Sequence, residues 1–256
     1  MTFSKIKILI PVLFSLLYIS CTREIPQVAD LNVNINKSAT LQVFNATVKS
    51  VRNYVYVDGV PVTGAALGFG SIFPGSAYGI AITPGSRAIL IKDTTANSIQ
   101  MPITFTQNFD AGKSYTTFTY DTLTSIKQIT VANNITIPTD TTSRLRFANF
   151  IYNTTTLPNV DVYSFRKIPG TPVIVNGSPV LSSSTPVFTN IATNTITEFL
   201  PYPSGLSDTL YVVATGSTTP IIAKQLVTSL VPSRSYTSVY SGSFKGTKAI
   251  STFATY

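Results

Sequence analysis

An internal repeat of alternating apolar and polar segments constrains the fold of this chain more than any other feature. Four segments recur in the same order in the two halves. In residues 109–118 and 230–239, a turn is followed by a basic residue, Ser, Tyr, Thr and an alternating strand. The other matched pairs are 41–45 with 145–149, 54–59 with 160–163, and 86–92 with 208–213. This shared order indicates two tandem copies of a unit of about 100 residues.

The segments themselves predict an all-β fold. They are short and alternating, they are bounded by Gly, Pro, Asn and Ser, and no segment outside the first twenty residues shows a convincing helical period. Asp58-Gly59 and Asn176-Gly177 are typical of tight hairpin turns. We therefore expect two tandem immunoglobulin-like antiparallel β-sandwich domains. The alternation predicts four core residues, Ile89, Ile91, Leu210 and Val212.

Tyr115 and Tyr236 hold the same place in the two copies, in the Ser-Tyr-Thr segment. One interpretation is a tyrosine corner, in which the hydroxyl ties a turn to the next strand. The other is an ordinary half-buried tyrosine of a strand.

The expected boundaries follow from the repeat and from the start of the chain. Residues 1–20 are predicted to be a signal peptide, and 21–37 a lipidated cysteine with a flexible tether. Residues 38–134 form the first sandwich, 135–142 a short Thr/Pro-rich linker and 143–256 the second sandwich. Residues 248–253 alternate and are expected to form a closing strand.

The start of the chain has the features of an export signal. Lys5 and Lys7 precede an apolar run, 8–19, that is too short to span a bilayer comfortably. Ser20-Cys21 follows, and this arrangement resembles the lipobox of bacterial lipoproteins, although Tyr18 stands where that pattern usually has Leu. The alternatives are a plain secretory signal with an incidental cysteine, or an uncleaved anchor. The resemblance implies that Cys21 carries acyl chains and becomes the first residue of an outer-membrane lipoprotein, on either face of that membrane.

Composition restricts the chemistry. The chain has no His and no Trp, and Cys21 is its single cysteine, so no Ser-His-Asp or Cys-His arrangement can be built. Charged residues make up 11%, and no Asp-rich loop or metal-ligand cluster occurs. The net charge of +8 falls to +6 without Lys5 and Lys7, and the remaining charges are scattered. We expect no enzyme activity, cofactor, metal or nucleic-acid partner.

Several short motifs resemble those of the domain of unknown function 4397 family. The second copy carries them at 160–163, 176–179, 214–220 and 234–237. The first copy keeps 56–59 and 113–116 but lacks the Gly-Ser-Thr-Thr-Pro loop. The resemblance covers nearly all of the chain after the signal peptide. It implies an exported cell-envelope β-sandwich and brings no catalytic residues.

Four Asp-Thr triplets, at 93–95, 121–123, 140–142 and 208–210, resemble the O-glycosylation signal of Bacteroidota. The candidate modified residues are Thr94, Thr122, Thr141 and Thr209, of which Thr141 in the linker is the best. The alternative is that a Thr-rich chain produces such triplets by chance, because Asp and Thr both favour turns.

The expected function is a binding or structural role as an adhesion, scaffold or accessory subunit. The lipid anchor would hold it on the membrane, and an envelope protein or a glycan is the expected partner. One alternative is glycan capture on exposed tyrosines near loops or strand ends, namely Tyr78, Tyr152, Tyr202 and Tyr240, although these could simply cover sheet edges with wet hydroxyls. The second alternative is a hydrolase, which would need two facing carboxylates; Asp93 and Asp110 are the candidate pair, although nothing in the sequence brings them together. The sequence does not identify the ligand-binding residues.

Overall fold

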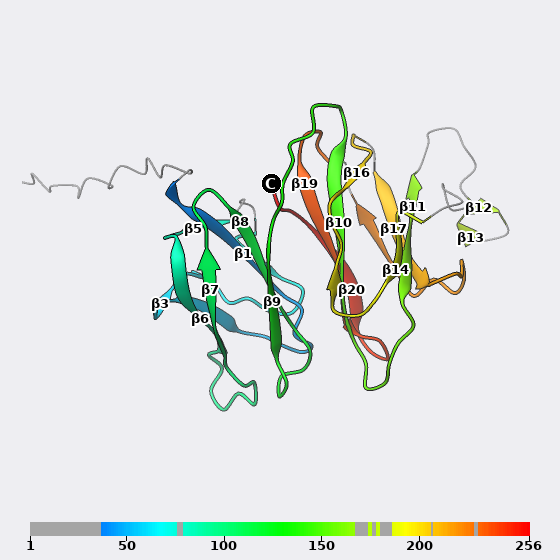
Figure 1. The fold of residues 1–256 in the computed structure, drawn as a ribbon. Helices are drawn as coiled ribbons and strands as arrows, with labels where there is room; N and C mark the ends of the chain where they lie inside the picture. The colour runs from blue at the N-terminus through cyan, green and yellow to red at the C-terminus, as the bar shows by residue number, and fades with distance from the viewer. Residues whose placement is uncertain are drawn as a thin grey trace, which may run out of the picture. The chain divides into compact units, whose positions relative to one another are not determined.

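The computed structural model describes residues 37–75, 79–166, 174–175, 178–179, 186–205, 207–227 and 230–256. These residues belong to one compact unit and contain twenty strands (Figure 1). The predicted all-β sandwich class is confirmed. In the ranges just given, no helix is long and apolar enough to cross a membrane.

The first sandwich consists of two sheets, of which the inner sheet packs on the second sandwich and the outer sheet does not. Its inner sheet has the order β4-β1-β8-β9, with β5 also beside β1: β1 (Ala39–Asn45), β4 (Ile72–Phe73), β5 (Ile80–Ile82), β8 (Ser114–Tyr120) and β9 (Lys127–Ala132). Its outer sheet has the order β3-β2-β6-β7: β2 (Asn53–Val57), β3 (Val60–Pro61), β6 (Gly85–Asp93) and β7 (Ile103–Phe109).

The second sandwich repeats this plan. Its inner sheet runs β15-β10-β19-β20, with β16 beside β10: β10 (Ser143–Tyr152), β15 (Thr195–Ile196), β16 (Leu200–Tyr202), β19 (Ser235–Ser243) and β20 (Lys248–Ala254). Its outer sheet runs β14-β11-β17-β18: β11 (Val160–Arg166), β14 (Phe188–Ile191), β17 (Asp208–Ala214) and β18 (Ala223–Val227). β12 (Ile174–Val175) pairs with β13 (Ser178–Pro179), as expected for the Asn176-Gly177 hairpin, whose two turn residues lie outside the described residues. The expected closing strand is β20.

One strand pair in each copy is parallel, so the sheets are not antiparallel throughout. β1 runs parallel to β8, and β10 runs parallel to β19. The remaining strand pairs of the described residues are antiparallel. Side chains alternate along a strand in the same way whether its neighbour runs parallel or antiparallel. The sequence pattern therefore could not predict the direction of pairing.

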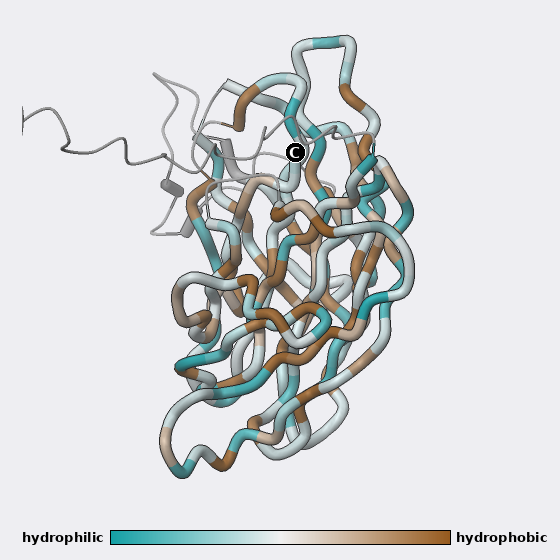
Figure 2. Tube along the Cα trace, turned by 90° about the vertical axis from the view of Figure 1, so that its left-hand side faces the viewer, coloured by the Kyte–Doolittle hydropathy of each residue, from teal (hydrophilic) through white to brown (hydrophobic). Residues whose placement is uncertain are grey.

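Each sandwich has its own core. Val55, Ile89 and Ile91 lie inside the first, and Leu210 and Val212 lie inside the second, each at most 1% exposed. All four predicted core residues are therefore confirmed. Figure 2 shows the hydrophobic positions interspersed with hydrophilic ones along the strands of both sandwiches.

A third apolar cluster joins the two inner sheets. Phe44 and Phe118 of the first sandwich pack on Phe253 and Phe150 of the second, with ring centroids 5.5 Å and 5.1 Å apart respectively. The inner strands are consequently buried on both faces. This explains why β1, β8, β10 and β19 are buried at nearly every position instead of at alternate ones.

The turns behave as their residues predict. Asp58 and Gly59 both have positive φ, 49° and 80°, and connect β2 to β3. The hydroxyl of Tyr115 accepts a hydrogen bond from the Asp110 N–H at 3.0 Å, five residues upstream. The hydroxyl of Tyr236 does the same with the Val231 N–H, also at 3.0 Å. The tyrosine-corner interpretation is thus confirmed in both copies.

Candidate functional site

The predicted modification residues have different surroundings. Cys21 lies outside the described residues. Thr94 and Thr141 are exposed, and Thr122 is half-buried in a turn. Thr209 is half-buried in the central strand β17, between β11 and β18. Glycosylation of these threonines stays a prediction. Of the four, only Thr209 lies within a strand that is paired on both sides.

The aspartates of these triplets all act as local hydrogen-bond acceptors. Asp93 accepts from the Thr95 N–H and the Ser98 hydroxyl, both at 2.7 Å. Burial raises the pKa of Asp93, but these hydrogen bonds outweigh it, so the pKa lies below its ordinary value. Asp121, Asp140 and Asp208 likewise accept backbone N–H groups within two residues. Local hydrogen bonding therefore accounts for each Asp without any glycan.

Asp93 and Asp110 lie at opposite ends of the β6–β7 hairpin. Asp93 ends β6, whereas Asp110 follows Phe109, which pairs with Gly85 at the start of β6. They do not face one another, so the carboxylate pair considered for hydrolysis is not formed. Across the described ranges, no group of three or more His, Cys, Asp or Glu side chains could hold a metal ion.

The tyrosines expected near loops do not form a binding row. Tyr202 and Tyr240 are 2% and 0% exposed, because both belong to the core of the second sandwich. Tyr202 donates its hydroxyl to the Asp208 carboxylate at 2.6 Å, so it is a structural side chain. Tyr152 is half-buried, and Tyr78 lies outside the described residues. The alternative interpretation, in which these tyrosines cover sheet edges with solvated hydroxyls, is also wrong for Tyr202 and Tyr240, because both are buried.

A different pair of tyrosines occupies an accessible sheet face. In β2, Val55 and Val57 point into the core, so Tyr54 and Tyr56 point to the other side of the sheet. Both are half-buried. Two residues of the adjacent strand β6 stand directly opposite them, Lys92 beside Tyr54 and Leu90 beside Tyr56. We call the outward side of β3-β2-β6-β7 the tyrosine face.

The rest of the tyrosine face is mostly uncharged. Thr104 of β7 pairs with Leu90 and is exposed, as is the neighbouring outward residue Thr106. The Lys92 ammonium lies 5.0 Å from the centroid of the Tyr56 ring, a cation–π contact. Apolar rings and methyl groups therefore alternate with hydroxyl groups and one cation.

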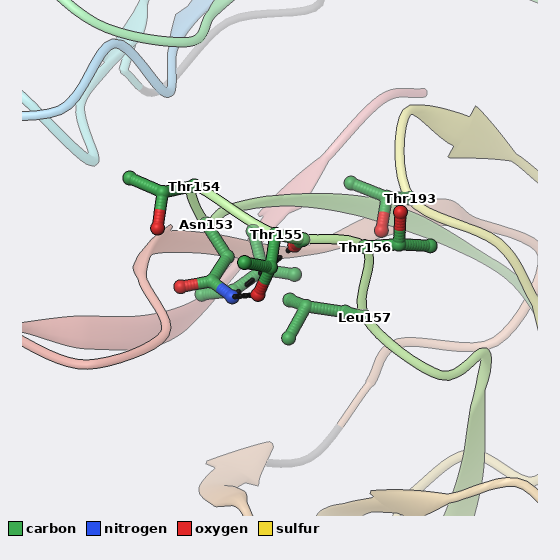
Figure 3. A pocket seen from close by; sticks show the side chains of 7 residues that line it. Asn153, Thr154, Thr155, Thr156, Leu157 and Thr193 are labelled. Atoms are coloured by element: carbon green, nitrogen blue, oxygen red, sulfur yellow. Dashed lines mark hydrogen bonds between the residues drawn. The ribbon is translucent and has the colours of Figure 1, made fainter.

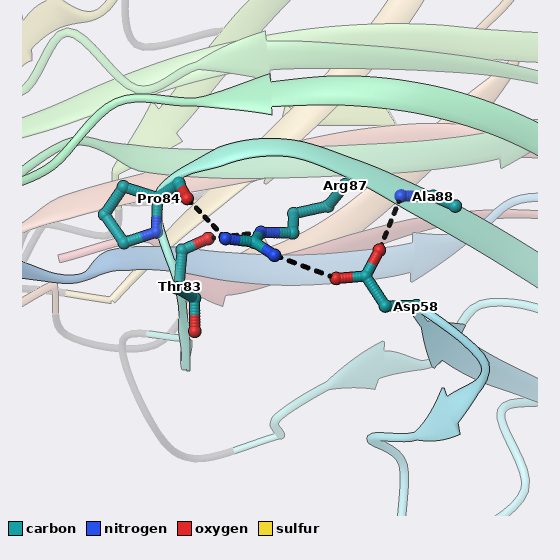
Figure 4. A network of polar contacts seen from close by, with 5 residues as sticks. All are labelled: Asp58, Thr83, Pro84, Arg87 and Ala88. Carbon is teal, nitrogen blue, oxygen red and sulfur yellow. Dashed lines mark hydrogen bonds and ion pairs between the residues drawn. The ribbon is translucent and has the colours of Figure 1, made fainter.

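A polar network fixes the rim of this face (Figure 4). Asp58 in the β2–β3 turn forms a 3.1 Å ion pair with Arg87 of β6 and accepts the Ala88 N–H at 2.9 Å. Arg87 also donates to the carbonyls of Thr83 and Pro84. The Ala88 hydrogen bond and then the Arg87 guanidinium hold the pKa of Asp58 below its usual value. The carboxylate is thus ionised and paired, which leaves Lys92 as the charge within the face.

The sequence contained a signal for this face. Tyr54 and Tyr56 are two residues apart in an alternating strand and are followed by Val55 and Val57 respectively. A strand of that pattern puts both rings on one side of a sheet. Of the tyrosines predicted near loops or strand ends, Tyr202 and Tyr240 are core residues instead.

The second sandwich has a small hollow of about 290 Å³ between the β10–β11 and β14–β15 loops (Figure 3). Its lining is rich in threonine: Ile151, Asn153, Thr154, Thr155, Thr156, Leu157 and Thr193. Asn153 donates to the Thr155 hydroxyl at 2.9 Å. The lining holds no charged side chain and no ring, so it offers less to a ligand than the tyrosine face.

Comparisons with known proteins give little beyond the fold. No family model matches the chain, and no curated protein matches it. Among solved structures, one describing alpha-glucan recognition by family 41 carbohydrate-binding modules of streptococcal virulence factors is 11% identical, with a TM-score of 0.25. It covers 84% of this chain and 97% of its own. Another, on alpha-glucan binding by a streptococcal virulence factor, is 7% identical, also with a TM-score of 0.25, and covers 83% and 97%. These TM-scores are too low to transfer a ligand.

Proposed function

We propose that this protein is a non-catalytic lipoprotein of the cell envelope that binds glycans on the tyrosine face. The observation that carries the proposal is the pair Tyr54 and Tyr56, whose rings share one side of a sheet with the exposed hydroxyls of Thr104 and Thr106. A sugar ring has apolar C–H faces and a polar rim. A tyrosine has the same amphipathic character, with an apolar ring and a hydroxyl at its tip.

The position of these tyrosines on the outward side of a sheet favours an extended ligand over a small molecule. Small-molecule sites are concave and bury most of their ligand. The tyrosine face is instead the outward side of a four-stranded sheet, with Tyr56, Leu90 and Thr104 in one cross-strand row. A polysaccharide chain can lie across such a row and contact several side chains at once, and this multiplicity compensates for weak individual contacts.

Export and anchoring through Cys21 complete the proposal. An extracytoplasmic location would bring the protein to polysaccharides of the envelope or the medium. The short apolar run 8–19 followed by Ser20-Cys21 supports this location. A lipid anchor would concentrate binding sites on the membrane surface, which raises the avidity for a polymeric ligand.

Affinity electrophoresis tests the glycan claim. The compact unit, residues 35–256, is run through native gels containing glycogen, xylan, mannan or a β-glucan. We expect at least one polymer to retard it, and the double variant Tyr54→Ala/Tyr56→Ala to lose about tenfold or more in affinity, as expected when stacking rings are removed.

The matched control is Tyr256→Ala, which removes a tyrosine that is 39% exposed at the C-terminus. It should bind like the unmodified protein. Retardation that persists in the Tyr54/Tyr56 variant, or the absence of retardation by every polymer, would show that the tyrosine face is not a glycan site.

The anchor has its own test. Cells producing the full chain are fractionated, and the N-terminal peptide of the membrane-bound form is analysed by mass spectrometry. We expect an acylated peptide beginning at Cys21, and a Cys21→Ala chain that remains unacylated. If the chain that retains Cys21 were neither acylated nor cleaved, the lipoprotein proposal would be wrong. Proteinase K treatment of intact cells then distinguishes a surface-facing from a periplasmic protein.

A further inference from the structure

Three large aliphatic side chains project from one end of the first sandwich. Val51, Ile99 and Met101 are 63%, 70% and 59% exposed. They belong to two loops, 46–52 between β1 and β2 and 94–102 between β6 and β7. We call this end the apolar tip.

The two loops are held together by a buried polar network directly behind these side chains. The Ser50 hydroxyl donates to the Gln100 amide oxygen at 3.0 Å and accepts from Asn45 and Asn53. Gln100 also donates to Asn53. Each of these four side chains is at most 6% exposed.

This network fixes the direction of the aliphatic side chains. Because Ser50 and Gln100 point inward, their chain neighbours Val51, Ile99 and Met101 point outward at the same end. Buried polar groups that are mutually satisfied make such a loop pair rigid. The exposure of the apolar tip is therefore built into the fold rather than being a result of loose loops, and exposed apolar clusters of this kind mark interaction sites.

The charges around the apolar tip are arranged asymmetrically. Lys49 and Arg52, on either side of Val51, are both exposed. The acidic residues have local partners: Asp93 accepts hydrogen bonds within its own turn and is attracted to Arg52, and Asp121 forms a 2.7 Å ion pair with Lys127, which leaves Lys49 as the cation without a nearby acidic residue among these. The surface that an approaching partner meets thus combines aliphatic side chains with cations.

We propose that the apolar tip inserts into an anionic lipid surface. Aliphatic side chains that enter the acyl boundary, flanked by basic residues at the level of the headgroups, are the composition that peripheral membrane binding requires. A protein interface would instead be expected to include aromatic side chains in a patch of roughly 800 Å² per partner. The apolar tip consists of loop ends and has no aromatic ring among its three exposed apolar side chains.

The chain length is compatible with insertion into the membrane that would hold Cys21. β1 begins 18 residues after that cysteine. A chain of that length spans up to about 60 Å when extended. This exceeds the length of the seven-residue strand β1, about 23 Å, which separates its tether end from the apolar tip.

Vesicle co-sedimentation tests the proposal on the compact unit, residues 35–256, which has no acyl anchor. The probes are phosphatidylcholine vesicles with and without phosphatidylglycerol. We expect binding to the anionic vesicles, a loss of about tenfold or more in the triple variant Val51→Ser/Ile99→Ser/Met101→Ser, and a partial loss in Lys49→Ala/Arg52→Ala.

The matched control, Val60→Ser/Val231→Ser, removes aliphatic side chains that are 63% and 51% exposed elsewhere, and should bind like the unmodified unit. Glycan retardation should be unchanged in the triple variant, which separates this proposal from the tyrosine face. Absence of vesicle binding, or equal binding by the triple variant, would overturn it. So would a dimer, seen by light scattering, that the triple variant loses, because the apolar tip would then be covered by a second copy.

Discussion

At the residue scale, two tyrosines of strand β19 differ in the use of their hydroxyl groups. Tyr236 accepts the Val231 N–H at 3.0 Å. The Tyr240 hydroxyl is buried and finds no hydrogen-bond partner among the described residues. A buried hydroxyl without a partner costs free energy, whereas a satisfied one contributes about 1 kcal/mol.

Replacing each hydroxyl should therefore have opposite effects. We expect Tyr240→Phe to leave the free energy of unfolding unchanged or to raise it by about 1 kcal/mol, and Tyr236→Phe to lower it by about 1 kcal/mol. Urea unfolding measures both. A Tyr240→Phe protein that is clearly less stable than the unmodified chain would mean that the hydroxyl has a partner.

The same side chain gives a pH dependence. Burial raises the pKa of Tyr240 above its ordinary value of 10.0. The stability linked to its protonated form is present below pH 10 and is lost as the pH rises further, because the unfolded chain ionises first. The unmodified protein should thus lose stability relative to Tyr240→Phe above pH 10, by at most about 1.4 kcal/mol per pH unit. Parallel curves of unfolding free energy against pH would contradict this.

Gly242 gives a second prediction at this scale. Its φ is +109°, and an added Cβ would lie 2.9 Å from the Lys248 Cα and still closer to the Thr247 carbonyl. Gly242→Ala should lower the free energy of unfolding by about 2–4 kcal/mol, because the backbone of β20 must shift. Gly64→Ala is the control and should be nearly neutral, because nothing lies within 4 Å of the added atom. Thermal unfolding measures both variants.

At the element scale, Arg146 of β10 connects the two inner sheets. It is 3% exposed and donates to Thr237 of its own sandwich at 2.8 Å and to Asn133 of the first at 2.7 Å. Its guanidinium lies 4.6 Å from the Phe199 ring centroid. Burial lowers the pKa of Arg146 to about 9, partly opposed by Glu198, so it remains charged at neutral pH.

Removal of this side chain should be costly. We expect Arg146→Ala to lower the free energy of unfolding by about 3 kcal/mol, since it leaves a cavity and removes the hydrogen bonds that the guanidinium donates to Thr237, Thr116 and Asn133. Arg146→Lys should recover only part of the loss, because an ammonium cannot reproduce the planar fork of donors. In a double-mutant cycle with Asn133→Ala, we expect a coupling energy of about 1 kcal/mol or more, and strict additivity would contradict the bridge.

At the scale of the whole molecule, the third cluster couples the two sandwiches. Phe150 lies at its centre, with ring centroids 5.1 Å from Phe118 and 5.0 Å from Tyr120. Because both inner sheets contribute to this cluster, we expect residues 35–256 to unfold in one cooperative transition. Phe150→Ala should lower its midpoint by an amount equivalent to about 3–5 kcal/mol. Calorimetry that resolves two well-separated transitions in the unmodified protein would show that the sandwiches unfold independently.

The sequence by itself determined the all-β class, the repeat of strands and the alternating cores of the outer sheets, and it offered the tyrosine corner as one of two interpretations. These features depend on local periodicity and on turn residues, which a single chain records directly. Ile89, Ile91 and the Asp58-Gly59 turn were predictable for that reason.

Only the tertiary structure decided the features that depend on which segments meet. The parallel pairing of β1 with β8, the inner sheets buried on both faces and the shared phenylalanine cluster arise from contacts between residues far apart in the chain. For the same reason Tyr202 and Tyr240 proved to be core residues, whereas Tyr54 and Tyr56 lie on an accessible face. Alternation assigns a side chain to one side of a strand, but the packing of other sheets determines whether that side is buried.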